Sequence, residues 1–219
     1  MPESARTLLS HRLRVIPAGG REASYLELPA GEFICGRAAE ATLRLDDPSV
    51  SPRHAQFVVG ASVWIIDLGS ANGVFARLSA PTVLRAGDEI RIGRQLLRLE
   101  GLPPPGQGKS GGRIWGSPAQ GHRFRLVQRL EGGMAGDALP LVDGDYLLGR
   151  EEGAMTFPGD LAISSRHCIL SVQGEQATLR DLGSANGTFV RIRGEQELRS
   201  GDQLLVGNEQ LRYEAVPLA

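Results

Sequence analysis

Short runs in which apolar and polar residues alternate recur along the chain. The clearest are RLRVIPA, SVWIIDL, EIRIGRQLLRLE, RFRLVQRL, ATLRDL and QLRYEAV. A period of two places the apolar side chains on one face of a strand, and these runs are rich in β-branched and large apolar residues. Gly, Pro, Asn and Asp fall between them, where turns are expected. No segment has a helical apolar stripe with caps. The pattern predicts an all-β fold, an antiparallel sandwich or barrel.

One peptide occurs twice, as DLGSANGVF at 67–75 and DLGSANGTF at 181–189, with eight of nine residues identical. Further landmarks recur in the same order at offsets of 113 or 114 residues. They are Gly36-Arg37 with Gly149-Arg150, Ser51–His54 with Ser164–His167, Gly87-Asp88 with Gly201-Asp202, and Gly93 with Gly207. The offset is 113 residues at His54 and His167 but 114 at Asp67 and Asp181. The hairpins VVGASVW and SVQGEQAT lie between these landmarks and can differ in length by one residue. The chain is therefore a duplication, which predicts two globular domains.

A Gly- and Pro-rich stretch separates the two repeats. Eleven of the 21 residues from Gly101 to Gly121 are Gly or Pro, a composition that resists packing and indicates a linker. We therefore predict a first domain at 12–101, a linker at 102–121 and a second domain at 122–216. Within the linker, Ile114 and Trp115 either cover a sandwich edge or lie on the surface of one domain, or they fix the angle between the domains.

Composition argues against several classes of protein. The net charge is −1, so no global field attracts nucleic acid, and no basic stripe or recognition helix is evident. No apolar run approaches the roughly 20 residues that span a bilayer, and the N-terminus lacks the apolar core of a secretory signal. Cys35 and Cys168 do not occupy matching positions, which suits a reducing compartment better than a disulfide framework. We expect a cytoplasmic protein without membrane insertion.

The histidines do not indicate a metal site. His11, His54, His122 and His167 are dispersed, and the cysteines are unpaired, so no ligand cluster appears. We expect no metal and no cofactor.

The ordered set of repeated landmarks resembles the forkhead-associated (FHA) domain, a phosphothreonine-binding β-sandwich. The resemblance covers about residues 12–101 and 122–216, and it is specific because the landmarks agree in order, spacing and number. It implies two sandwiches in which the loops at one end bind a phosphopeptide.

The resemblance assigns phosphate binding to an arginine and a serine in each repeat. Arg37 and Arg150 match the family Arg that grips phosphate, a role that suits the planar fork of guanidinium donors. Ser51 and Ser164 match the Ser whose hydroxyl donates to the phosphate.

Other matched residues hold the peptide or the loops. Asn72 and Asn186 match the Asn whose amide holds the backbone of the bound peptide, a task that uses both a donor and an acceptor. The resemblance implies structural roles for a further set: Gly36, His54, Gly73, Gly149, His167 and Gly187. Arg53 and Arg166 either face the peptide near the phosphate or are solvated charges at the rim of the site.

The two repeats depart from the family pattern to different degrees. Ser165 matches a position that often contacts phosphate, whereas Pro52 at this position has neither an N–H nor a polar side chain. Both repeats have Ala before the Asn, at Ala71 and Ala185, where a hydroxyl residue is common. We therefore expect the second repeat to be the more competent phosphate binder.

Together, these expectations predict a bacterial adaptor protein that binds Thr-phosphorylated proteins and acts downstream of a Ser/Thr kinase. One alternative is an FHA-like scaffold that assembles partners without phosphate, for example in a secretion apparatus. An enzyme is disfavoured, because the Ser-x-x-His segments lack a nucleophile elbow and a residue placed to orient the His. Thr7, if phosphorylated, would be a self-ligand, although an unmodified tail is the simpler interpretation.

Overall fold

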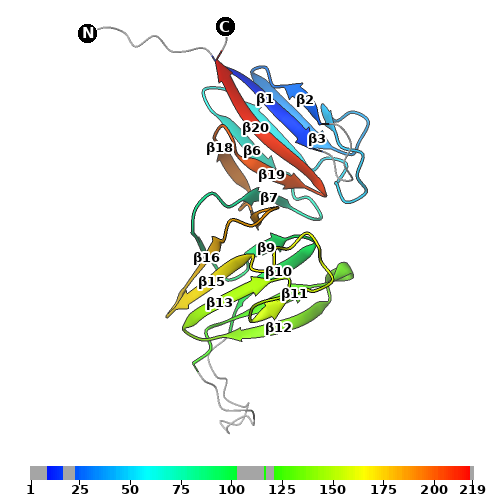
Figure 1. The fold of residues 1–219 in the computed structure, drawn as a ribbon. Coiled ribbons are helices and arrows are strands. Elements are labelled where there is room, and N and C mark those ends of the chain that lie inside the picture. Colours follow the sequence, from blue (N-terminus) through cyan, green and yellow to red (C-terminus); the bar gives the residue numbers. More distant parts are fainter. Residues whose placement is uncertain (1–8, 17–22, 103–115, 117–120, 218–219) are drawn as a thin grey trace, which may run out of the picture. The chain divides into compact units, whose positions relative to one another are not determined.

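The computed structural model describes residues 9–16, 23–102, 116 and 121–217, and its regular secondary structure is almost entirely β-strand (Figure 1). The all-β prediction is confirmed. Within the described ranges, helical structure is limited to the 3₁₀ turn η1 (Glu131–Gly133). No helix in the described part is long and apolar enough to cross a membrane. Thr7, Ile114 and Trp115 lie outside the described residues.

The chain divides into two compact units. Unit 1 combines the residues up to Arg77 with those from Arg191 onward, and unit 2 is the continuous stretch Leu78–Val190. The chain therefore leaves unit 1 after Arg77, completes unit 2 and returns at Arg191. Unit 2 is thus an insertion into the sequence of unit 1.

Unit 1 is a sandwich of two five-stranded sheets. Its strands are β1 (Leu9–Ile16), β2 (Ser24–Glu27), β3 (Gly31–Gly36), β4 (Leu43–Arg44), β5 (Ala55–Val59), β6 (Val63–Asp67), β7 (Val74–Arg77), β18 (Glu195–Leu198), β19 (Gln203–Val206) and β20 (Glu209–Pro217). The strand orders are β7-β19-β20-β1-β2 and β18-β6-β5-β3-β4. These pairs are antiparallel except for β3 with β4, which is parallel.

Unit 2 repeats this arrangement. Its strands are β8 (Thr82–Leu84), β9 (Glu89–Ile92), β10 (Gln95–Gly101), β11 (Phe124–Arg129), β12 (Ala135–Leu141), β13 (Gly144–Gly149), β14 (Met155–Thr156), β15 (Cys168–Gln173), β16 (Gln176–Asp181) and β17 (Thr188–Arg191). The strand orders are β12-β11-β10-β9-β17 and β14-β13-β15-β16-β8. Again, only β13 and β14 pair in parallel.

Each sandwich takes its last three strands from the other sequence repeat. In unit 1, β18–β20 occupy the places that β8–β10 occupy in unit 2. The compact units therefore differ from the predicted consecutive domains at 12–101 and 122–216. The physical reason is that the repeats are alike enough for either set of final strands to complete either sandwich.

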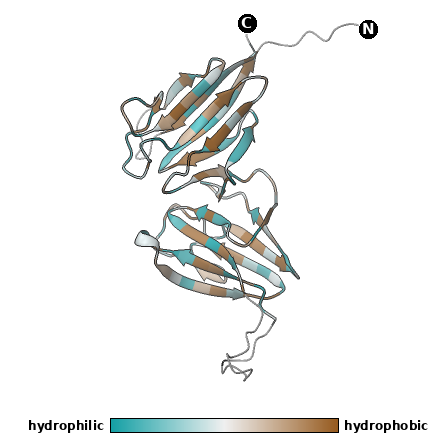
Figure 2. Ribbon diagram, turned by 180° about the vertical axis from the view of Figure 1, so that it is seen from behind, coloured by the Kyte–Doolittle hydropathy of each residue, from teal (hydrophilic) through white to brown (hydrophobic). Residues whose placement is uncertain are grey.

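The two hydrophobic cores reflect this exchange. The core of unit 1 contains residues of the second repeat, namely Ile192, Leu198, Leu204, Val206, Leu211 and Tyr213. The core of unit 2 contains residues of the first, namely Leu84, Ile90, Ile92, Leu97 and Leu99. Figure 2 shows the strand alternation of apolar and polar residues that produces these inner faces. Burying each such side chain contributes roughly 1.5–3 kcal/mol. The side chains that one core takes from the other repeat therefore contribute together about as much as the net stability of a typical domain.

The predicted linker connects two neighbouring strands of one sheet. Residue Gly101, at the end of β10, is paired with Phe124, at the start of β11. Both strands belong to unit 2. In unit 1 the corresponding neighbours are β1 and β20, which lie near the two ends of the chain. The stretch 102–121 thus joins the two repeats in sequence while its flanking strands lie in the same unit.

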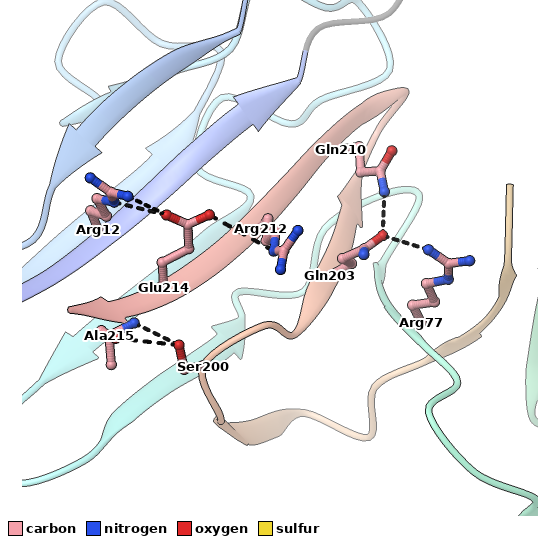
Figure 3. Close-up of polar contacts among 8 residues, drawn as sticks. All are labelled: Arg12, Arg77, Ser200, Gln203, Gln210, Arg212, Glu214 and Ala215. Carbon is pink, nitrogen blue, oxygen red and sulfur yellow. Dashed lines mark hydrogen bonds and ion pairs between the residues drawn. The ribbon is translucent and has the colours of Figure 1, made fainter.

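Polar contacts in unit 1 also join the two repeats (Figure 3). The Nε of Arg12 on β1 donates to the carboxylate of Glu214 on β20 at 2.8 Å. Arg77 on β7 donates to the side-chain oxygen of Gln203 on β19 at 2.9 Å. On the same sheet, the Nδ1 of His11 and the hydroxyl of Tyr213 are 2.7 Å apart.

Candidate functional site

Three loops meet at one end of the unit 1 sandwich. Because β3, β5 and β6 are antiparallel neighbours, the end of β3, the start of β5 and the end of β6 share an edge. The backbone N–H of Arg37 donates to the carbonyl of Ser51 at 3.0 Å. The Ser51 hydroxyl oxygen accepts the N–H of Ala71 at 3.1 Å, and the Asn72 amide donates to the carbonyl of Ser49 at 2.7 Å. The loops bearing Arg37, Ser51 and Asn72 are thus joined.

Unit 2 has the same arrangement. The N–H of Arg150 donates to the carbonyl of Ser164 at 2.9 Å, and the N–H of Ala185 donates to the Ser164 hydroxyl oxygen at 3.2 Å. The Asn186 amide donates to the carbonyl of Ala162 at 2.8 Å. The repeat therefore builds the same loop cluster twice, once in each unit.

The two serine hydroxyls are oriented as donors. Ser51 and Ser164 each use the hydroxyl oxygen to accept a backbone N–H, and in the described part of the chain neither hydroxyl proton has an acceptor. Each hydroxyl therefore keeps a proton to donate to a ligand. Each asparagine amide likewise uses one N–H on a carbonyl, which leaves its oxygen to accept a hydrogen bond from another donor.

Two fully buried histidines connect the loops. The N–H of Ser51 donates to Nδ1 of His54 at 3.0 Å, and Nε2 of His54 lies 3.0 Å from the carbonyl of Gly73. A backbone N–H only donates and a carbonyl only accepts, so the proton of this neutral ring is on Nε2. His167 makes the matching contacts with Ser164 and Gly187 at 3.1 Å each.

The Ser–His pairs do not have the geometry of a nucleophilic dyad. Each His acceptor nitrogen is occupied by the serine backbone N–H rather than by the hydroxyl. The cysteines are free and buried, and burial raises the pKa of both Cys35 and Cys168 to about 12, so they stay protonated at neutral pH.

Glycine is required at two kinds of position in the loops. At Gly36 and Gly149, a Cβ would overlap the carbonyl oxygen of Pro52 or Ser165, so a side chain would separate the loops. Gly73 and Gly187 follow the Asn with φ of 78° and 86°, a left-handed conformation that glycine adopts at little cost.

Each loop cluster is also held by a turn from the other repeat. In unit 1, the buried carboxylate of Asp47 accepts the backbone N–H of Asn208 at 2.7 Å. In unit 2, Asp160 accepts the N–H of Arg94 at 2.8 Å and the side-chain amide of Gln95 at 2.9 Å. These two aspartates are not among the repeated landmarks that predicted the site. Their shared offset of 113 residues was the available signal.

The buried side chain of Thr188 stabilises the LGSANG turn of the second repeat, residues 182–187. Asp181 accepts hydrogen bonds from the Ser184 and Thr188 hydroxyls, each at 2.6 Å. Burial alone would raise the pKa of Asp181, but these hydrogen bonds and those from backbone N–H groups outweigh it and hold the pKa below its ordinary value. In the first repeat, Asp67 lies 3.7 Å from the guanidinium of Arg191.

The surroundings of the two arginines differ. Among the described residues, Arg37 makes one side-chain hydrogen bond, from Nε to the carbonyl of Val50 at 3.2 Å. Arg150 forms an ion pair with its neighbour Glu151 at 2.9 Å, and Arg166 forms one with Glu152 at 3.1 Å. Within the described residues, neither Arg37 nor Arg53 forms an ion pair.

Comparison with known proteins identifies both repeats. The FHA domain model matches residues 33–93 and 146–207, together more than half of the chain. The chain is 34% identical to the glycogen accumulation regulator GarA of Mycobacterium tuberculosis over 107 residues, covering 48% of this chain and 65% of that protein. It is also 34% identical to the oxoglutarate dehydrogenase inhibitor of Corynebacterium efficiens over 85 residues, covering 37% and 60%. The chain thus spans about two thirds or less of these relatives.

Among solved structures, the FHA domain of CT664 from Chlamydia trachomatis matches with 15% identity and a TM-score of 0.41, covering 96% of this chain and 99% of that chain. The family assignment rests on the sequence matches, which include the Gly, Arg, Ser, His and Asn landmarks of both loop clusters. The chain therefore belongs to the FHA domain family and carries that domain twice.

Proposed function

We propose that the chain is a two-site adaptor that binds Thr-phosphorylated proteins. One observation carries this proposal: in both units, an arginine, a serine hydroxyl and an asparagine amide lie on loops that hydrogen bonds join. A phosphothreonine offers three strong acceptor oxygens and nearly two negative charges, which match the guanidinium and hydroxyl donors. The asparagine amide then supplies a contact to the peptide backbone.

Two sites in one chain allow two modes of binding. One doubly phosphorylated partner could occupy both sites, in which case the second contact becomes intramolecular and avidity rises. Two singly phosphorylated proteins could instead be bridged.

The proposed setting is a bacterial cytoplasm in which a Ser/Thr kinase creates the ligand. Two of the similar proteins are, by name, a regulator and an enzyme inhibitor, which supports a role in acting on other proteins rather than in catalysis. A phosphate-independent scaffold is the competing function, favoured by Pro52 in unit 1 and by the Glu151–Arg150 ion pair in unit 2.

The test compares binding of the full chain to an array of phosphothreonine peptides and their unphosphorylated forms. Arg37→Ala and Arg150→Ala are each expected to weaken the phosphate-dependent binding of the affected site by about tenfold or more, since each removes charge-assisted hydrogen bonds. The matched controls are Arg199→Ala in unit 1 and Arg85→Ala in unit 2. These exposed arginines lie in turns at the opposite ends of the sandwiches and should not matter. Binding that ignores phosphate and both site arginines would support the scaffold instead.

A further inference from the structure

One carboxylate in unit 2 occupies Arg150, which the proposed function assigns to phosphate, and Ser165, which the family resemblance matches to a phosphate contact. The Nε and Nη2 atoms of Arg150 donate to one oxygen of Glu151 at 3.0 and 2.9 Å. The Ser165 hydroxyl donates to the other oxygen of Glu151 at 3.2 Å. The carboxylate thus bridges a guanidinium and a hydroxyl, as a phosphate group would.

A second ion pair joins the same two segments of unit 2. The guanidinium of Arg166 lies 3.1 Å from the carboxylate of Glu152. The hydrogen bonds from Arg150 and Ser165 hold the pKa of Glu151 below its ordinary value, so this side chain is ionised at neutral pH. An arriving phosphate therefore meets two carboxylates beside the two arginines.

Unit 1 provides the natural comparison. Where the second repeat has Glu151 and Glu152, the first has Ala38 and Ala39. In the part of the chain that the structure describes, Arg37 and Arg53 are without carboxylate partners. Apart from its Nε, which binds the carbonyl of Val50, the guanidinium of Arg37 is open to an anion.

We propose that Glu151 is a built-in competitor for phosphate in unit 2, so that phosphate enters the Arg37 site of unit 1 first. This inference rests on the proposed function and reverses the ranking expected from the sequence, where Ser165 favoured the second repeat. Ser165 holds the competing carboxylate instead of standing free for phosphate.

The competitor is displaceable rather than a permanent block. The side chains of Arg150 and Glu151 are 29% and 59% exposed, so solvent screens their attraction. Exposed ion pairs of this kind correspond to changes of roughly two- to fivefold in an equilibrium constant. Phosphate carries more charge than one carboxylate and is therefore expected to displace it at higher concentration.

The test uses the full chain labelled with ¹⁵N and inorganic phosphate as the probe. The Nε–H signals of Arg37 and Arg150 report the two sites separately and are assigned with Arg→Lys variants. In the unmodified chain, Arg37 should respond at lower phosphate concentration than Arg150. Glu151→Gln should lower the half-saturating concentration at Arg150 by about two- to fivefold, and Ala38→Glu should raise that at Arg37 similarly.

The matched control is Glu175→Gln. It removes the same charge from unit 2 in the hairpin between β15 and β16, at the end of the sandwich away from the loops, and should leave both responses unchanged. If the half-saturating phosphate concentration at Arg150 is unchanged or higher in Glu151→Gln, while Arg37 still binds phosphate, Glu151 is not a competitor. Absence of any response at either arginine in all variants would instead overturn the proposed function, and the competitor with it.

Discussion

The carboxylate of Asp47 accepts the backbone N–H of Asn208, a residue 161 positions later in the chain, at 2.7 Å. Asp47 also accepts the N–H and the hydroxyl of Ser49, at 2.8 and 2.6 Å. Since the carbonyl of Ser49 receives the amide of Asn72, the position of this candidate peptide-binding side chain depends on a turn from the second repeat. The loops of one repeat are therefore completed by the other.

Replacing Asp47 should loosen unit 1 without removing any proposed ligand contact. Asp47→Ala removes a charged acceptor from the N–H and hydroxyl of Ser49 and from the N–H of Asn208, and we expect the free energy of unfolding to fall by about 2 kcal/mol. Chemical denaturation measures this, and faster hydrogen exchange at the Asn208 amide would locate it. The control is Asp46→Ala, which removes an exposed neighbouring carboxylate. Equal stability of the two variants would contradict the role given to Asp47.

The contribution of Asp47 should depend on pH. Burial alone would raise its pKa, but hydrogen bonds from Ser49 and Asn208 outweigh burial and hold the pKa below the ordinary value of 3.8. A carboxyl group with a lowered pKa in the folded state stabilises the protein fully above its unfolded pKa, and this stability is lost as pH falls through the folded pKa. The difference between wild type and Asp47→Ala should therefore be constant from pH 7 to about pH 5 and shrink below about pH 3.8. Denaturation midpoints across this range measure it. A difference that persisted unchanged in strong acid would show that the charge of Asp47 is irrelevant.

Thr188 offers a test that the chain itself suggests, since the first repeat has Val74 at the same place. Thr188 is fully buried, and its hydroxyl donates to Asp181 at 2.6 Å. Thr188→Val keeps the shape but removes this donor, so we expect a loss of about 1–2 kcal/mol in unfolding free energy and a rise in the pKa of Asp181 toward its ordinary value. Thr188→Ser, which retains the hydroxyl, should lose less of the hydrogen-bond contribution. Calorimetry and NMR titration of Asp181 measure the two effects, and an unchanged Asp181 titration would contradict the coupling.

The sequence was sufficient to predict where strands form and that the repeated landmarks lie in the loops between them, because both depend on local patterns. Alternation predicted the run EIRIGRQLLRLE, which forms β9 and β10 around the turn at Gly93. The one-residue change in offset was also predictable. The hairpin after β5 has a three-residue loop, 60–62, whereas that after β15 has a two-residue loop, 174–175, between longer strands.

The exchange of strands between repeats is not encoded in such patterns. Arg12 pairs with Glu214 in unit 1, and Arg125 pairs with Glu100 in unit 2. These are matching positions, so the unexchanged arrangement would also pair an arginine with a glutamate. His11 is more selective, because Tyr213 offers it a hydroxyl while the matching Leu99 offers none. The competitor Glu151 was likewise visible as an acidic residue, but its contact with Arg150 depends on side-chain geometry.

A cysteine crosslink distinguishes the exchanged arrangement from two consecutive domains. Ser10 on β1 is opposite Val216 on β20, and directly opposed residues in antiparallel strands lie within the range that a disulfide spans. Ser10→Cys with Val216→Cys should therefore form an intrachain disulfide in the monomer, detected by peptide mapping without reductant. Leu102 occupies the position of the first repeat that corresponds to Val216, so Ser10→Cys with Leu102→Cys is the matched control and should remain reduced. The buried Cys35 and Cys168 are not expected to compete, because their thiols stay protonated. The opposite result, with the control pair crosslinked and the first pair reduced, would show that each repeat completes its own sandwich.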